Sequence, residues 1–341
     1  MKKYMSYLLF TVLLMFTVAS CTQMKEADSK QAGNNMGAVA TNQVLVTTEW
    51  LASNINNPNV RIIDRQDTIP KDNFYAQGHI PGAIHMRTNI VKGKKVDIKE
   101  MLIIKDLVAF LEKNGISEKN HVIVMGSAKK LPAVSRVFWA LEYLGHKNVS
   151  VLDGGLEKWK AEGRAITTEF PQFSPVTYNV NLQRSKKVTG EEIYESLGLF
   201  DKLNIIVIDS RRPPEVKGVK HSRNTKTVLG KVPGSKGLMF MALLQPKTKE
   251  FKSADQIQMI FNKHGITKDK TVYVMCVSGC FGSSIYLGAR LLGYENIALY
   301  DGSWIEWIKK GYPVEDKTGE IITPDSEYAE ADEDEESSEG C

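Results

Sequence analysis

Two stretches of the chain share one pattern of apolar and polar positions. In each, a run of four strand-forming residues, 122–125 and 272–275, leads into a short loop and then into an apolar helix pattern. A second short apolar strand follows each helix and ends in an Asp-Gly turn, at Asp153 and at Asp301. The whole pattern returns about 150 residues later. The chain therefore contains two copies of one unit.

Each copy alternates strands with helices, and further short apolar runs at 60–63 and 205–208 precede the shared pattern. This alternation is typical of an α/β fold in which a parallel sheet is covered by helices on both faces. We predict two such tandem domains, at 44–168 and 188–316, joined by a linker at 169–187. Trp159 and Trp307, at apolar helix positions, are expected to pack in the cores.

The two copies differ where the first strand of the pattern ends. Cys276 stands there in the second copy and Gly126 in the first. Backbone N–H groups of such a loop, together with the positive end of the following helix, favour an anionic sulfur. The pattern predicts nucleophilic catalysis by Cys276 and a catalytically silent first domain. The other interpretation is that Cys276 is a small core residue at a strand end.

Several further segments resemble the tandem rhodanese-like sulfurtransferases, over roughly residues 44–316. The first copy has Gly78-His79-Ile80-Pro81-Gly82, and the second has the weaker Gly230-Lys231-Val232-Pro233-Gly234. The segment from Asp209 through Arg211 to Glu215 and the two Asp-Gly turns also match the family's pattern. In tandem members the second domain is catalytic and the first lacks its cysteine, as here.

The resemblance implies a reaction that needs no organic cofactor. Cys276 would take a sulfane sulfur from a small anionic donor, thiosulfate or 3-mercaptopyruvate, and pass it from a persulfide to cyanide or a thiol. Ser278 matches a loop serine of mercaptopyruvate-using members, whose hydroxyl would relay a proton to the leaving enolate. His79 matches a histidine that approaches this serine in such members. The alternatives are a hydroxyl that closes the turn and a histidine that caps one.

Donor binding is assigned by the same resemblance. Arg211 matches the family arginine that grips the donor's carboxylate or sulfonate, and the alternative is an ion pair with Asp209 or Glu215. The remaining predicted substrate-binding positions are Val277, Gly279, Cys280, Phe281 and Gly282. Val277 and Phe281 depart from the small or hydroxylated residues expected in a mercaptopyruvate-type loop.

Cys280 is a second cysteine in this segment, where the family usually has an aliphatic residue. We predict either a redox partner that forms a disulfide with Cys276 or a packing residue without a role. Two other functions stay open: a thiol-disulfide redox protein and a non-enzymatic binding lipoprotein. A related phosphatase is disfavoured, because Gly282 occupies the place of its phosphate-binding arginine. Cys276 and Cys280 lack partners at metal-ligand spacing, so no metal site is predicted.

The amino-terminal segment resembles a bacterial lipoprotein signal peptide. Lys2 and Lys3 precede an apolar run at 7–18, too short for a comfortable membrane span, which ends in Val18-Ala19-Ser20-Cys21. The resemblance implies a signal peptide at 1–20, lipidation of Cys21 and a flexible tether at 21–43. We therefore expect a lipid-anchored protein of the bacterial cell envelope, on a periplasmic or surface face.

The carboxyl-terminal segment, 317–341, is acidic and lacks apolar periodicity, so we expect it to be disordered. Its carboxylates offset a basic body within a formal net charge of +4. A basic body attracts small anions, although ordinary surface lysines have the same effect. No interleaving of aromatic and basic residues points to nucleic acid. The sequence carries no indication of an oligomeric state.

Overall fold

The computed structural model describes residues 43–324, except 67, 70–71, 88, 93–101, 103 and 223–227. The predicted signal peptide, Cys21, nearly all of the tether and the end of the acidic segment lie outside these residues. No helix in the described part of the chain is long and apolar enough to cross a membrane.

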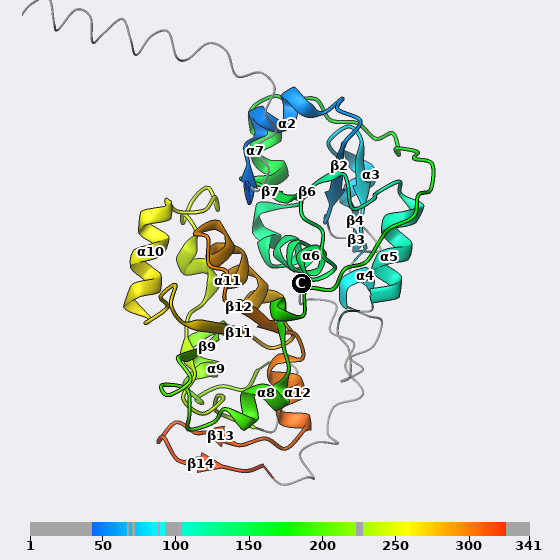
Figure 1. Cartoon of the computed structure of the whole chain (residues 1–341). Coiled ribbons are helices and arrows are strands. Elements are labelled where there is room, and N and C mark those ends of the chain that lie inside the picture. The colour runs from blue at the N-terminus through cyan, green and yellow to red at the C-terminus, as the bar shows by residue number, and fades with distance from the viewer. Residues whose placement is uncertain are drawn as a thin grey trace, which may run out of the picture. The chain divides into compact units, whose positions relative to one another are not determined.

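The first domain is built on a five-stranded parallel sheet with the strand order β1-β7-β6-β2-β5 (Figure 1). Its strands are β1 (Leu45–Val46), β2 (Val60–Asp64), β5 (Ala83–His85), β6 (His121–Met125) and β7 (Val149–Leu152). Its helices are α2 (Thr48–Asn54), α3 (Phe74–Gln77), α4 (Asn89–Lys92), α5 (Ile104–Lys113), α6 (Leu131–Tyr143) and α7 (Gly155–Ala161), with a 3-10 turn η1 (Ala128–Lys130). An antiparallel pair, β3 (Thr68–Ile69) and β4 (Asp72–Asn73), stands apart from this sheet.

The second domain repeats this sheet in the order β10-β9-β11-β12-β8. Its strands are β8 (Lys187–Val188), β9 (Ile205–Asp209), β10 (Lys236–Gly237), β11 (Thr271–Met275) and β12 (Ile297–Tyr300). Its helices are α8 (Gly190–Glu195), α9 (Pro213–Val216), α10 (Ala254–Lys263), α11 (Cys280–Leu291) and α12 (Ser303–Lys309), with 3-10 turns η2 (Arg184–Lys186) and η3 (Phe240–Leu243). The predicted duplicated α/β fold is confirmed.

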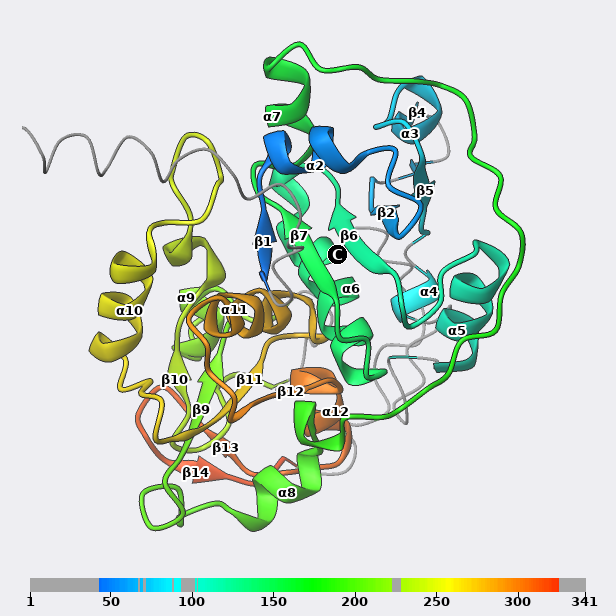
Figure 2. The same ribbon diagram turned by 45° about the horizontal axis from the view of Figure 1, so that its top comes forward.

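Both faces of each sheet are covered, as the apolar strands require. In the first domain, α5 and α6 pack on one face and α2 and α7 on the other, and in the second domain α10 and α11 face α8 and α12 across the sheet (Figure 2). Trp159 on α7 and Trp307 on α12 are buried in the cores, as predicted.

Helices α6 and α11 pack against each other and join the two domains. Glu142 on α6 accepts hydrogen bonds from Tyr286 Oη (2.6 Å) and Arg290 Nε (3.2 Å) on α11. Burial, followed by the charge of Glu142, raises the pKa of Tyr286 well above its ordinary value. One continuous apolar core passes through this contact.

The described chain between residues 168 and 183 has no helix or strand, where we predicted a linker. After α12, an antiparallel pair forms from β13 (Val314–Glu315) and β14 (Ile321–Ile322). Strand β14 lies beyond residue 316, the predicted end of the second domain.

Candidate active site

Cys276 lies at the carboxyl end of β11, the central strand of the second sheet. Parallel sheets place their catalytic loops at this edge. The loop is short, because α11 begins at Cys280, and Gly279 makes the turn into the helix with a φ of 83°. A left-handed residue at this point is most easily a glycine. The strand therefore delivers the thiol directly to the helix amino terminus.

The Asp301-Gly302-Ser303 turn after β12 is hydrogen-bonded to the backbone of Cys276. The Cys276 N–H donates to Ser303 Oγ (3.2 Å), and the Ser303 hydroxyl donates to the Tyr300 carbonyl (2.7 Å). In return, the Trp304 N–H donates to the Cys276 carbonyl (3.0 Å). Ser303 has a φ of 52°, a conformation that non-glycine residues adopt at a cost. The sequence identified this turn as part of the family pattern but did not indicate a role for Ser303.

Several backbone donors of the loop are left for a ligand. Within the described residues, the N–H groups of Val277, Ser278 and Gly279 have no hydrogen-bond acceptor, and the first bond into α11 is from the Ser283 N–H to the Gly279 carbonyl (3.0 Å). The first-turn N–H groups of an α-helix also lack partners within it. Together with the helix dipole, these donors form a cradle for an anion beside Cys276.

The loop therefore ends before three of the predicted substrate-binding positions, Cys280, Phe281 and Gly282, which lie in α11. Phe281 and Gly282 belong to the first turn of α11, and the Phe281 ring packs on Phe240 with 5.0 Å between centroids. Cys276 is a free thiol and 2% exposed, so its redox pairing with Cys280 stays a prediction.

The structure does not bring His79 to the cysteine loop. His79 is fully buried in the first domain and stacks on Tyr75 at 3.8 Å between ring centroids. Its Nδ1 lies 2.8 Å from the Tyr75 carbonyl oxygen, and its Nε2 lies 3.0 Å from the Glu169 carbonyl oxygen. Because both ring nitrogens face backbone carbonyls, no nitrogen is left to orient Ser278. The arrangement fits the alternative, a histidine that fixes local backbone.

The Arg211 side chain is buried and paired within the second domain. It is 1% exposed and pairs with Asp209, with Nη2 2.6 Å from Oδ2. The remaining guanidinium nitrogens donate to Asp209 from Nε (2.9 Å) and to Ser222 Oγ from Nη1 (3.3 Å). Nη2 also donates to the Gly230 carbonyl (2.8 Å), and the group lies 3.9 Å over the Trp304 ring. The structure thus contains the ion pair with Asp209 that was the alternative, and donor binding by Arg211 stays a prediction.

The counterpart of this pair in the first domain has no arginine. The strand registers Asp209↔Met275 and Asp64↔Met125 make Asp64 the equivalent of Asp209. Gln66 then stands where Arg211 does, and it donates to Asp64 from its backbone N–H (2.9 Å) and from Nε2 (2.7 Å). Burial raises the pKa of Asp64 to about 6, because these neutral donors offset only part of the cost of burying its charge.

The same registers place Gly126 opposite Cys276. The Leu156 N–H donates to the Gly126 carbonyl (3.0 Å), as Trp304 does to Cys276. In the first domain, however, a carboxylate of the same domain binds the N–H and hydroxyl groups of the loop. Glu157 accepts hydrogen bonds from the Ser127 hydroxyl (2.5 Å) and the Ala128 N–H (2.8 Å). Its counterpart in the second domain is Ile305, which has no charge to place in the cradle.

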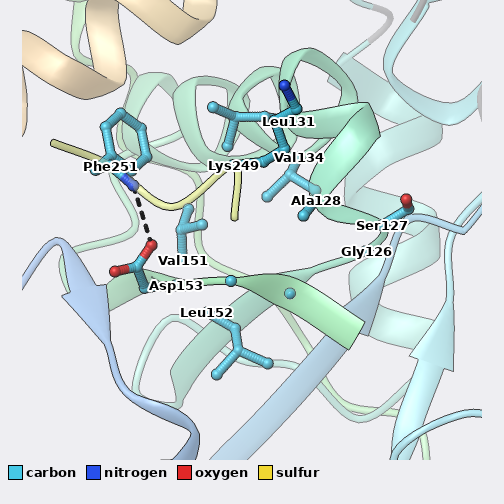
Figure 3. Close-up of a pocket in the computed structure, with 12 residues that line it drawn as sticks. Gly126, Ser127, Ala128, Leu131, Val134, Val151, Leu152, Asp153, Lys249 and Phe251 are labelled. Carbon is cyan, nitrogen blue, oxygen red and sulfur yellow. Dashed lines mark hydrogen bonds between the residues drawn. The ribbon is translucent and has the colours of Figure 1, made fainter. Parts of the chain in front are cut away.

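A pocket lies beside Gly126. Its wall includes the first-domain loop, Asp153, and two second-domain residues, Lys249 and Phe251. Figure 3 shows Asp153 turned toward Phe251, whose N–H lies 3.4 Å from Oδ1. No cluster of three or more His, Cys, Asp or Glu side chains suited to a metal occurs among the residues described.

Comparison with known proteins gives a consistent result. The Rhodanese-like domain family matches residues 47–162 and again residues 194–310. The sulfur carrier protein TtuD of Thermus thermophilus is 29% identical, over 78% of this chain and 93% of its own. The 3-mercaptopyruvate sulfurtransferase of Rattus norvegicus is 28% identical, over 82% of this chain and 96% of its own.

Solved structures show the same fold. SseA from Escherichia coli, described as a 3-mercaptopyruvate sulfotransferase, superposes with a TM-score of 0.65 at 23% identity. The match covers 77% of this chain and 99% of SseA.

Proposed function

The chain belongs to the rhodanese-like domain family and is a sulfurtransferase, and we propose that it moves a sulfane sulfur through a persulfide on Cys276. The donor is thiosulfate or 3-mercaptopyruvate, and the acceptor is cyanide or a thiol. The observation that carries this proposal is the free Cys276 thiol set at a cradle of backbone donors, while the equivalent first-domain position is Gly126.

The two half-reactions need only this thiol and this cradle. The Cys276 thiolate attacks the outer sulfur of thiosulfate, a new S–S bond forms, and sulfite leaves with the electron pair of the old S–S bond. With 3-mercaptopyruvate the C–S bond breaks instead, and the enolate of pyruvate leaves and takes up a proton. Cyanide then attacks the outer persulfide sulfur, forming thiocyanate and returning the thiolate. Loop N–H groups stabilise the anionic sulfur throughout.

The test is sulfur transfer from both donors, with cyanide and with a dithiol as acceptors. Wild-type protein should turn over at least one donor. Cys276→Ser should lose transfer to every acceptor. Cys280→Val, a substitution at the first residue of α11, should retain it. Transfer by folded Cys276→Ser at the wild-type rate would remove Cys276 from the mechanism.

Ser278 offers a test of donor class. If its hydroxyl delivers a proton to the leaving enolate, Ser278→Ala should slow the use of 3-mercaptopyruvate about 100-fold, the scale of general acid catalysis. Use of thiosulfate should change little, because sulfite leaves without that proton. Equal loss with both donors would make Ser278 a loop-closing residue.

For location, we propose a lipid anchor at Cys21 and a place in the bacterial cell envelope. The support is the sequence alone: two lysines, a short apolar run and the Ala-Ser-Cys21 segment. Cells fed a labelled fatty acid should label the wild-type protein and not Cys21→Ser. A wild-type protein without label, recovered in the soluble fraction, would contradict the anchor.

A further inference from the structure

Arg136 belongs to the silent first domain but lies against the cysteine loop of the second. It projects from α6, and its side chain is 1% exposed. Its Nη2 forms an ion pair with Asp301 Oδ1, and its Nε donates to the Val91 carbonyl (3.3 Å). The guanidinium also lies 4.6 Å from the centre of the Trp139 ring. A charge buried this completely is costly unless its partners hold it in one geometry.

The remaining nitrogen of the guanidinium faces the loop. A Cβ built on Gly279 would lie 2.7 Å from Arg136 Nη1 and 3.2 Å from Asp301 Oδ1. Among the residues that the structure describes, Nη1 has no hydrogen-bond acceptor. The ion pair therefore forms the floor beneath Gly279, and a buried donor is aimed at the loop that must hold an anionic sulfur.

Asp301 connects this arginine to the nucleophile. It opens the turn in which Ser303 Oγ accepts the Cys276 N–H (3.2 Å) and the Trp304 N–H bonds the Cys276 carbonyl (3.0 Å). A second first-domain group, the Leu102 N–H, donates to Asp301 Oδ2 (3.2 Å). Two first-domain groups thus hold the turn that is hydrogen-bonded to Cys276.

We propose that Arg136 is a positioning residue for sulfur transfer. By holding Asp301 and the floor under Gly279, it keeps the loop N–H groups directed at the Cys276 sulfur. The silent domain thereby completes the active site of its partner domain. This role rests on the proposed function for its reaction, although loop geometry can be measured without any sulfur donor.

Two readouts test it. The first is the rate at which iodoacetamide alkylates Cys276 at fixed pH, followed by peptide mass spectrometry. Arg136→Gln should lower this rate roughly tenfold, since a displaced cradle stabilises the reactive thiolate less well. The second is turnover with thiosulfate and cyanide. There, kcat should fall roughly ten- to hundredfold while the KM for thiosulfate changes less than about threefold, as expected for misplaced reacting groups.

The matched control is Arg290→Gln. Arg290 also pairs across the α6–α11 contact, with Glu142 at 3.2 Å, but it does not touch the loop. It should lose stability and keep both the alkylation rate and kcat. If Arg136→Gln fails to fold, Arg136→Gln/Asp301→Asn removes both buried charges together and should show the same two losses.

Folded Arg136 variants with wild-type alkylation and kcat would overturn the proposal, and so would equal losses in Arg290→Gln. A wild-type protein that transfers no sulfur would contradict the proposed function instead, and the alkylation rates would still decide the role of Arg136.

Discussion

The two domains have the same turn and loop, but different residues lie at the loop. In the second, Cys276 faces loop N–H groups that have no acceptor among the described residues. In the first, Gly126 stands at that place and Glu157 binds the loop through Ser127 and Ala128. A loop of this geometry favours a bound anion. The two copies therefore differ both in the thiol, which the second has at this place and the first lacks, and in the carboxylate that binds the loop of the first.

A second difference concerns the buried aspartate at the end of the neighbouring strand. Asp209 has a full guanidinium partner in Arg211, whereas Asp64 has only the amide of Gln66. The second domain therefore has a buried ion pair that the first lacks, and donor binding by Arg211 stays a prediction. Exchanging single residues between the two domains tests these differences.

The largest effect is expected from Arg211→Gln, which copies the first-domain arrangement into the second. It leaves Asp209 buried without a cation, so the free energy of unfolding at neutral pH should fall by about 3–5 kcal/mol. Urea unfolding measures this, with exposed Arg212→Gln as the control. Wild-type stability combined with a raised KM for an anionic donor would instead return Arg211 to donor binding.

Asp64 should make stability depend on pH. Its pKa is raised from 3.8 to about 6, so the folded state binds the proton more tightly and loses relative stability as pH rises between these values. The loss attributable to this group is about 3 kcal/mol, from the size of the shift. Asp64→Asn does not titrate, so the difference between its unfolding free energy and that of the wild type should grow in favour of the variant by about 2 kcal/mol between pH 4 and pH 6. A constant difference would contradict the raised pKa.

Ile305→Glu copies the first-domain plug into the catalytic domain. A carboxylate there would bind the free loop N–H groups with charge-assisted hydrogen bonds and compete with an anionic donor. We expect the thiosulfate concentration for half-maximal rate to rise roughly tenfold. This factor corresponds to less free energy than the new hydrogen bonds to the carboxylate would contribute. Steady-state kinetics measure it, and Ile305→Gln, of similar size without the charge, is the control. An equal effect in both variants would indicate steric disruption.

The smallest effect is expected from Glu157→Gln, which weakens the plug of the silent loop. Since Glu157 is exposed, the melting temperature should fall by no more than about 4 °C, and sulfur transfer should not change. Thermal unfolding by circular dichroism, beside turnover, checks both. A lost turnover would mean that the first-domain loop takes part in the reaction.

The fold was predictable because its signals are local and occur twice. Apolar runs such as 122–125 and 272–275 mark buried strands. The duplication aligns the two copies residue by residue, and the strand register within each sheet agrees with that alignment. That register also identifies Cys276 and Gly126 as counterparts. The sequence alone therefore places Cys276 at the end of a buried strand, and its role as nucleophile stays a prediction.

The partners of charged and aromatic side chains were not predictable in this way. The spacing of Arg211 from Asp209 permits both a donor grip and an internal ion pair, and only the geometry around Trp304 decides between them. His79 fits its motif, yet the carbonyl of Glu169, far along the chain, takes its second nitrogen. Arg136 carried one weak signal, an arginine within an otherwise apolar helix pattern.

Intact-protein mass spectrometry tests the central claim most directly. After incubation with thiosulfate or 3-mercaptopyruvate and removal of the donor, wild-type protein should carry the added mass of one sulfur atom, mapped to Cys276. Cyanide should remove that mass and release one equivalent of thiocyanate. Cys276→Ser should gain no sulfur. A wild-type protein that gains no sulfur from either donor, or a Cys276→Ser protein that gains as much, would contradict the account.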